Sequence, residues 1–114
     1  MQLDIHSEVV HGHTVVVPRG ELDLVTQTEL KRFVNDLVVN GQVHLVIDLD
    51  QTTFLDSTGL GALISARRQT HTFQGSFAIV CSQPRILRLF KIVSLDKVFT
   101  IHASRDELAE EQLT

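Results

Sequence analysis

The sequence predicts a single α/β domain built on a mixed, mainly parallel β-sheet with helices. Strand-like and helix-like segments alternate along the chain in the order ββαβαβαβα. Two of the strand-like runs, 43–49 and 76–81, are apolar almost throughout, which is typical of strands buried on both faces of a parallel sheet. The length of 114 residues suits one domain, which we expect to span residues 1–114.

The first strands are predicted to form a β-hairpin. Residues 3–10 and 14–19 are rich in β-formers, and His11-Gly12-His13 between them fits a turn. Pro18 and Gly20 are expected to end the second strand. The two histidines of the turn have no third metal ligand spaced nearby, so we expect them to be solvated.

A helix is predicted from Thr26 to the pair Asn40-Gly41. Thr26 and Glu29 fit a capping box at its start, and Asn-Gly is typical of a helix end. Its apolar residues recur at helical spacing and form one stripe, made of Leu30, Phe33, Val34, Leu37 and Val38.

A buried strand at 43–49 comes next, followed by a linker at 50–55. A helix is predicted to begin in the segment 56–61 and to end between His71 and Gly75. The next predicted element is the strand at 76–81.

The C-terminal part is predicted to hold a helix, a short strand and a last helix. The first helix runs from Pro84 to about Val93 and buries Ile86, Leu89, Phe90 and Val93. Arg85, Arg88 and Lys91 are expected to form a solvated basic stripe on its outer face. The strand covers 98–101, and a capping box at 104–107 starts a helix that ends near Gln112.

Composition argues against several classes of function. The net charge is −4 and the basic residues are scattered, so we expect no direct nucleic-acid partner. The chain has no long apolar segment and no signal peptide, so we expect no membrane partner. The single cysteine, Cys81, ends an apolar run and is expected to be buried and inert. One cysteine gives no sign of an oxidising compartment, and we expect a cytoplasmic protein.

The most informative segment is Asp56-Ser57-Thr58-Gly59-Leu60-Gly61, at a strand-to-helix junction. Free N–H groups and the positive end of a helix stabilise an anion there. Ser57 is therefore well placed to carry a phosphate or to perform chemistry. The alternative is that Asp56 or Ser57 only caps the helix and that the glycines only pack.

Enzymatic interpretations of this segment fit poorly. A G-x-S-x-G nucleophile elbow is absent because Leu55 precedes Ser57 by two residues, and the chain has no phosphate-binding P-loop string. Asp48 and Asp50 are expected to be strand-end carboxylates and turn formers. A receiver-domain site would need an acidic pair after the first strand, where only Asp4 stands. We therefore predict no enzyme, no catalytic residue, no metal ligand and no cofactor.

A second polar loop, Gly20-Glu21-Leu22-Asp23, precedes the first helix. Sites of parallel sheets gather beyond the carboxyl ends of strands. This loop and residues 50–58 would lie side by side if their strands were neighbours.

The motifs of the chain resemble those of the STAS domain in the anti-sigma factor antagonist family. The resemblance spans about residues 3–108 and rests above all on the specific D-S-T-G-L-G segment 56–61. Three further segments carry it, namely Gly20-Glu21-Leu22-Asp23 with Leu30, Val46-Ile47-Asp48-Leu49, and 84–90 with Leu95. The chain departs from the family at Ser94, where a glycine is common, so the bend at 93–95 is expected to differ.

The resemblance implies a switch controlled by phosphorylation. The unphosphorylated protein would bind an anti-sigma factor with serine kinase activity and release the sigma factor. That kinase would then phosphorylate Ser57, and a serine phosphatase would reset the cycle. Asp23, Asp56, Thr58, Gly59, Leu60 and Gly61 would take part in partner binding.

Two questions stay open at this point. Leu60 is as well suited to the core as to a partner-facing surface. Some STAS proteins act as scaffolds or transporter accessory modules without phosphorylation, which is the alternative function. The sequence does not indicate the oligomeric state.

Overall fold

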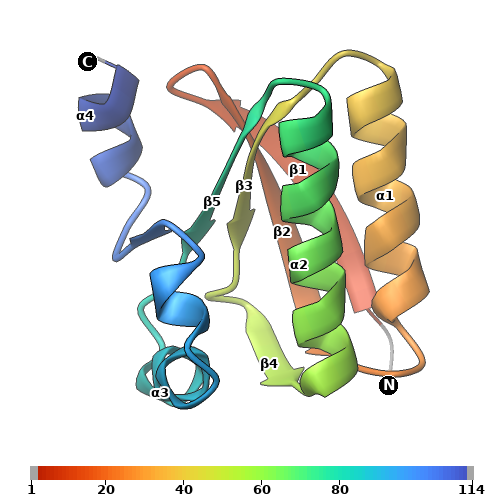
Figure 1. The fold of residues 1–114 in the computed structure, drawn as a ribbon, viewed down its shortest axis with the longest axis vertical. Coiled ribbons are helices and arrows are strands. Elements are labelled where there is room, and N and C mark those ends of the chain that lie inside the picture. The colour runs from red at the N-terminus through yellow and green to blue at the C-terminus, as the bar shows by residue number, and fades with distance from the viewer. Residues whose placement is uncertain (1–2, 113–114) are drawn as a thin grey trace.

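The chain begins with a β-hairpin (Figure 1) in this computed structural model, which describes residues 3–112. Strand β1 (Leu3–Val10) pairs antiparallel with β2 (His13–Leu22) from Leu3 opposite Gly20 to Val10 opposite His13. The predicted hairpin is confirmed, and His11 lies exposed in its turn.

The prediction that Pro18 and Gly20 end the second strand is wrong. β2 continues to Leu22 because a fourth strand, β4 (Thr52–Leu55), pairs with its last residues in parallel. The pairing register shifts between Gly20 and Glu21, and Gly20 adopts a φ of 121° that favours glycine. The hydroxyl of Thr52 also donates to the Pro18 carbonyl at 2.9 Å, which ties the two strands together.

Strand β4 lies where a linker was expected at 50–55, so that prediction is also wrong. The strand is only four residues long, and its buried residues, Thr52 and Leu55, flank two exposed ones. This pattern has neither the alternation of a half-buried strand nor the apolar run of a buried one. The observed order is therefore ββαββαβαβα with one short 3-10 helix.

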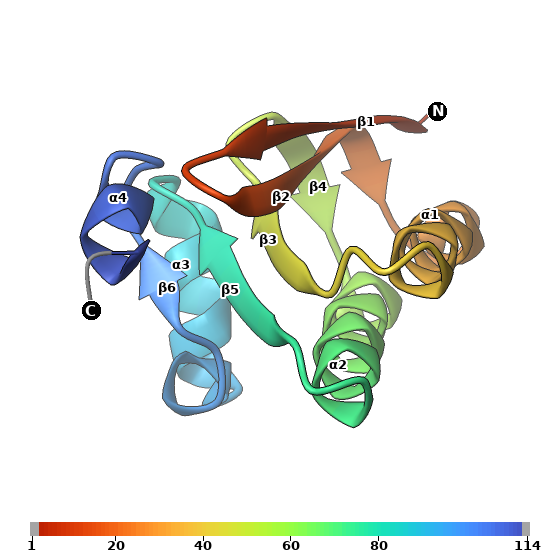
Figure 2. The same ribbon diagram turned by 90° about the horizontal axis from the view of Figure 1, so that it is seen from above.

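The six strands form one mixed sheet, which curves when seen from above (Figure 2). Its order is β1-β2-β3-β5-β6. On the side of β2 away from β1, residues 14–16 pair with β3 and residues 20–22 pair with β4. Every pairing except β1 with β2 is parallel, as the sequence predicts. The remaining strands are β3 (His44–Asp48), β5 (Ser76–Val80) and β6 (Ile101–His102).

Helices cover both faces of the sheet. Helices α1 (Gln27–Val39) and α2 (Ser57–Thr72) lie side by side on one face, and α3 (Pro84–Ile92) packs into the same core (Figures 1 and 2). Helix α4 (Glu107–Gln112) lies on the other face, where its fully buried Leu108 contacts a separate cluster of valines from β2, β3 and β5. No helix within residues 3–112 has the length and apolar character needed to cross a membrane.

Both predicted capping boxes differ from the structure. The Thr26 side chain does not cap α1 but donates to the Glu21 carbonyl at 2.6 Å, because the loop between β2 and α1 turns back on itself around Asp23. Glu107 is the first residue of α4 instead of its third, and its carboxylate accepts the Ala103 N–H at 3.3 Å. The apolar stripe of α1 is confirmed, with Leu30, Val34 and Val38 buried.

The segment after α3 is the least regular part of the fold. Ile86 and Phe90 are buried as predicted, but Val93 is exposed because α3 ends at Ile92. Ser94 then adopts a left-handed conformation with φ of 62°, and a 3-10 helix (Leu95–Lys97) follows. The last strand, β6, is accordingly shorter and later than the predicted 98–101.

Replacing Ser94 with glycine should raise the free energy of unfolding by about 0.5–1 kcal/mol. A left-handed conformation costs a residue with a Cβ roughly 1–2 kcal/mol, and part of the gain is offset by the greater freedom of glycine in the unfolded chain. Urea denaturation at neutral pH measures the difference. Ser94→Ala keeps the Cβ and is the matched control. A gain in both variants, or in neither, would contradict the strain at this residue.

Candidate functional site

Asp56 holds the start of helix α2. Its carboxylate oxygen Oδ1 accepts hydrogen bonds from the Thr58 hydroxyl at 2.6 Å and the Gly59 N–H at 2.9 Å. These bonds, that from the Thr58 side chain above all, lower the pKa of Asp56 below its ordinary value. The backbone carbonyl of Asp56 accepts the first bond of the helix, from the Leu60 N–H at 2.9 Å. Asp56 is therefore the N-cap.

Ser57 is the first residue of α2, and it is exposed. Among the described side chains, those of residues 3–109, and the backbone of 3–112, its hydroxyl has no hydrogen-bond partner, so it has no structural role of the kind that Asp56 has. Of the two capping alternatives that the sequence leaves open, the structure selects Asp56. The hydroxyl of Ser57 faces solvent at the end of a helix where negative charge is best tolerated.

The first turn of α2 presses against the end of β2. The Asp56 N–H donates to the Leu22 carbonyl at 3.4 Å. A Cβ on Gly59 would collide with that same carbonyl and would lie 2.7 Å from a methyl group of Leu55. Only glycine fits at residue 59, so the packing of α2 against β2 is enough to account for a glycine there, and no partner is needed.

Leu60 and Gly61 differ in exposure. Leu60 is 7% exposed and belongs to the main core, which answers the question that the sequence left open in favour of burial. Gly61 is exposed, and nothing lies within 4 Å of the position that its Cβ would take. No intramolecular contact therefore requires a glycine at residue 61.

Asp23 shapes the loop between β2 and α1. Its Oδ1 accepts the N–H groups of Val25 and Thr26, both at 3.0 Å, and forms an Asx-type turn. Leu22 pairs with Leu55 across β2 and β4, so the two polar loops do lie side by side, as the sequence predicts for neighbouring strands. Figure 1 shows this loop, the end of β4 and the start of α2 at one edge of the sheet.

Exposed apolar side chains surround this edge, and sequence reasoning missed them. Leu24 and Val25 are 68% and 79% exposed, and Phe54 in β4 is also exposed. Leu24 lies two residues after Leu22, whose carbonyl accepts the Asp56 N–H, and Phe54 lies two residues before Asp56. Large apolar residues grouped around a charged loop are typical of a protein-binding surface. The sequence could have indicated this surface, because Leu24 and Val25 are apolar and lie between the predicted strand and helix, in neither of them.

The other candidates from the sequence have structural roles. Asp48 accepts the Arg105 guanidinium at 2.8 Å, and Asp50 accepts the Ser82 N–H at 2.7 Å, so both act as strand-end carboxylates. Cys81 is buried, and burial raises the pKa of its thiol to about 11. Among the side chains of residues 3–109, no group of three or more His, Cys, Asp or Glu is placed to hold a metal ion.

Comparison with known proteins adds the family context. The sequence profile of the STAS domain matches residues 4–108. The anti-sigma-B factor antagonist of Listeria monocytogenes is 28% identical over 96 residues, which cover 84% of this chain and 84% of that protein. The crystal structure of an anti-sigma factor antagonist from Mycobacterium paratuberculosis is 27% identical, with a TM-score of 0.84 over 99% of this chain and 96% of that one.

The fold also matches the Bacillus cell fate determinant SpoIIAA, whose structure is known in a phosphorylated form. That chain is 15% identical, with a TM-score of 0.70 over 96% of this chain and 98% of its own. At this identity the likeness shows a shared fold alone.

The two glycines of the motif provide a matched pair of variants. Gly59→Ala should lower the free energy of unfolding by about 1–3 kcal/mol, because the new methyl group would meet the Leu22 backbone. Gly61→Ala should raise it by up to about 1 kcal/mol, because the site is open and alanine favours helix. Thermal and urea unfolding measure both. Equal effects of the same sign would contradict the close approach at Gly59.

A second pair of variants, Asp56→Ala and Ser57→Ala, distinguishes the contribution of the Asp56 cap to stability from that of the Ser57 hydroxyl. Asp56→Ala should lower the free energy of unfolding by about 1 kcal/mol, and Ser57→Ala should change it by less than about 0.5 kcal/mol. Because the pKa of Asp56 is lower in the folded state, its contribution is present above its unfolded pKa and is lost as pH falls through the folded value. The difference between wild type and Asp56→Ala should therefore shrink in acid. A larger loss for Ser57→Ala would make Ser57 the cap.

Proposed function

This chain belongs to the STAS domain family, and we propose that it is an anti-sigma factor antagonist switched by phosphorylation of Ser57. The names of the relatives from Listeria monocytogenes and Mycobacterium paratuberculosis support the antagonist role, because those proteins align with most of this chain. In its unphosphorylated form the protein binds an anti-sigma factor with serine kinase activity, and the sigma factor is released.

The division between Asp56 and Ser57 carries this proposal. A phosphoacceptor must be reachable by a kinase and must be free of bonds that the fold needs. Ser57 is exposed and its hydroxyl has no hydrogen-bond partner within the described chain, while Asp56 makes the cap. A phosphate on Ser57 would therefore alter the surface and leave the start of α2 in place.

The partner is proposed to cover the edge of the sheet around Ser57. Leu24, Val25 and Phe54 supply apolar contact area there, and the Asp23 turn presents the first two. The exposed backbone at Gly61 lets a partner approach the helix closely. Gly59 and Leu60 contribute indirectly, since both are buried and hold the helix against the sheet. The remaining contacts come from the polar side chains of Asp56 and Thr58.

Charge repulsion is the proposed means of release. A phosphoserine adds about −1.5 to −2 charges beside the carboxylate of Asp56. A partner carboxylate about 5 Å from the phosphate would be repelled by roughly 3 kcal/mol per unit charge at an effective dielectric constant near 20. That energy corresponds to about a hundredfold loss of affinity, so the complex separates without any refolding.

The protein is thus proposed to be the substrate of a kinase and not an enzyme itself. A serine phosphatase removes the phosphate and completes the cycle. We propose that the exchange takes place in the cytoplasm, because the one cysteine is buried as a free thiol and the chain carries no disulfide.

Incubation with each anti-sigma factor kinase of the source organism and ATP, followed by intact mass measurement, tests the modification. We expect one phosphate on the wild type with at least one kinase and none on Ser57→Ala. Ser65→Ala, a serine within α2, is the matched control and should still be modified. If no active kinase modifies the wild type, the scaffold or transporter accessory function replaces this proposal.

Ser57→Asp separates the surface effect of charge from any effect on the fold. We expect kinase binding to weaken by at least tenfold, since even one negative charge adds to that of Asp56. Calorimetry measures the binding, and the circular dichroism spectrum should stay unchanged. Loss of the folded spectrum would mean that Ser57 supports the structure.

A further inference from the structure

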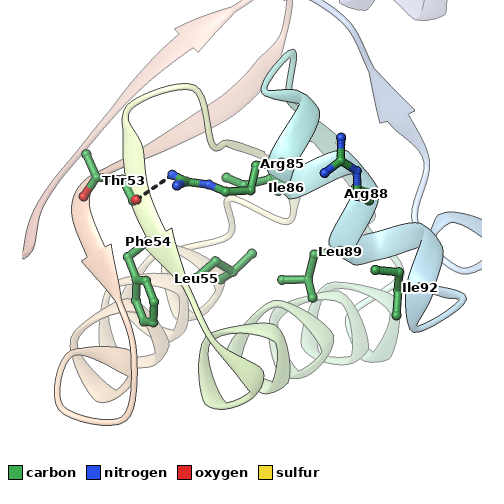
Figure 3. A pocket seen from close by; sticks show the side chains of 8 residues that line it. All are labelled: Thr53, Phe54, Leu55, Arg85, Ile86, Arg88, Leu89 and Ile92. Atoms are coloured by element: carbon green, nitrogen blue, oxygen red, sulfur yellow. Dashed lines mark hydrogen bonds between the residues drawn. The ribbon is translucent and has the colours of Figure 1, made fainter.

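A pocket of about 340 Å³ lies between strand β4 and helix α3 (Figure 3). Its walls are mostly apolar, and they come from two elements that are far apart in the sequence. The apolar residues that line it are Phe54, Leu55, Ile86, Leu89 and Ile92. Ile92, at the end of α3, is 72% exposed, so the pocket is open to solvent on that side.

Two arginines of α3 give the pocket a positive rim. Arg85 reaches across from the helix to β4, where its Nη2 donates to the Thr53 carbonyl at 3.1 Å (Figure 3). This bond positions the guanidinium and leaves most of its donors available. Arg88 follows one turn later, and it makes no hydrogen bond or ion pair with the part of the chain whose side chains are described, residues 3–109. No acidic residue lines the pocket.

We propose that this pocket binds an aliphatic carboxylate with a chain of about eight carbons. The alkyl chain lies along Leu55, Leu89 and Ile92, and the carboxylate lies at the rim that Arg85 and Arg88 make positive. The volume is near the lower end of the range of about 300–1,000 Å³ for small-molecule sites, which suits a single short chain. Guanidinium groups pair with carboxylates through parallel hydrogen bonds, so the rim selects the charged end of the ligand.

The charge of the rim also argues against a second copy of this chain as the occupant. A symmetric dimer whose two-fold axis passes through the pocket would bring the positive rims of the two copies together. Such like charges repel unless an anion lies between them. An apolar ligand without charge would leave both guanidinium groups unused. The amphiphilic anion is the occupant that satisfies both parts of the pocket.

Titration of the wild-type protein with octanoate, followed by amide NMR, tests the site. We expect saturable shifts in 52–55 and 84–92, with a dissociation constant of about 1 mM or tighter, as suits a ligand of this size. Octanol, which has the same chain without the charge, should bind at least tenfold more weakly. Absence of saturable shifts, or equal affinity for octanol, would overturn the proposal.

Three variants sharpen the test. Arg85→Gln/Arg88→Gln should weaken octanoate binding at least tenfold. Lys31→Gln/Arg32→Gln removes the same number of charges from the exposed face of α1 and should leave the affinity unchanged. Ile92→Glu, at an exposed position, should abolish binding while the spectrum stays that of a folded protein. Pocket shifts that depend on protein concentration without octanoate would assign the pocket to a second copy and overturn the proposal.

Discussion

The close approach of helix α2 to the end of strand β2 is the constraint on which the site depends. Gly59 lies against the Leu22 carbonyl, which also accepts the Asp56 N–H. A side chain at residue 59 would push the helix away from the sheet. The pairing of β2 with β4 sets the other side of this junction, because it brings Leu55 opposite Leu22. The serine, the Asp23 turn and the exposed apolar residues meet at one edge for this reason.

At that edge, Asp56 stabilises the fold, and its neighbour Ser57 is the residue proposed to be phosphorylated. Asp56 uses its carboxylate to satisfy donors of the first helical turn, so its contribution is to stability. Ser57, one residue later, is exposed and its hydroxyl makes no bond that the described fold needs. A modification there changes the charge of the surface without removing a bond that the helix needs. Under the proposed function, this separation would let affinity change by electrostatics alone, with no rearrangement of the core.

The parts of the fold predicted from the sequence are those with long, regular patterns. The stripe of α1 and the apolar runs of β3 and β5 follow from burial on a fixed period, which local sequence reports directly. Strand β4 was missed because its four residues follow no period, and β2 was cut short because the partner that extends it was unknown. Thr26 stands at the N-cap position of α1 as predicted, but the capping box did not form because the Thr26 hydroxyl bonds to Glu21, a partner outside its own helix.

The sequence by itself determined the α/β class, the parallel core strands and the position of the D-S-T-G-L-G segment at a helix start. Those properties depend on local periodicity and on helix-end chemistry, which neighbouring residues encode. Only the tertiary structure decided that Asp56 is the cap, that Leu60 is buried and that β4 and α3 enclose a pocket. The burial of Leu60 and the pocket depend on segments some thirty residues apart, such as β2 and α2, which meet only once the sheet has formed. The bonds of the Asp56 cap are local, and its sequence pattern fitted Ser57 equally well, so only the structure separates the two.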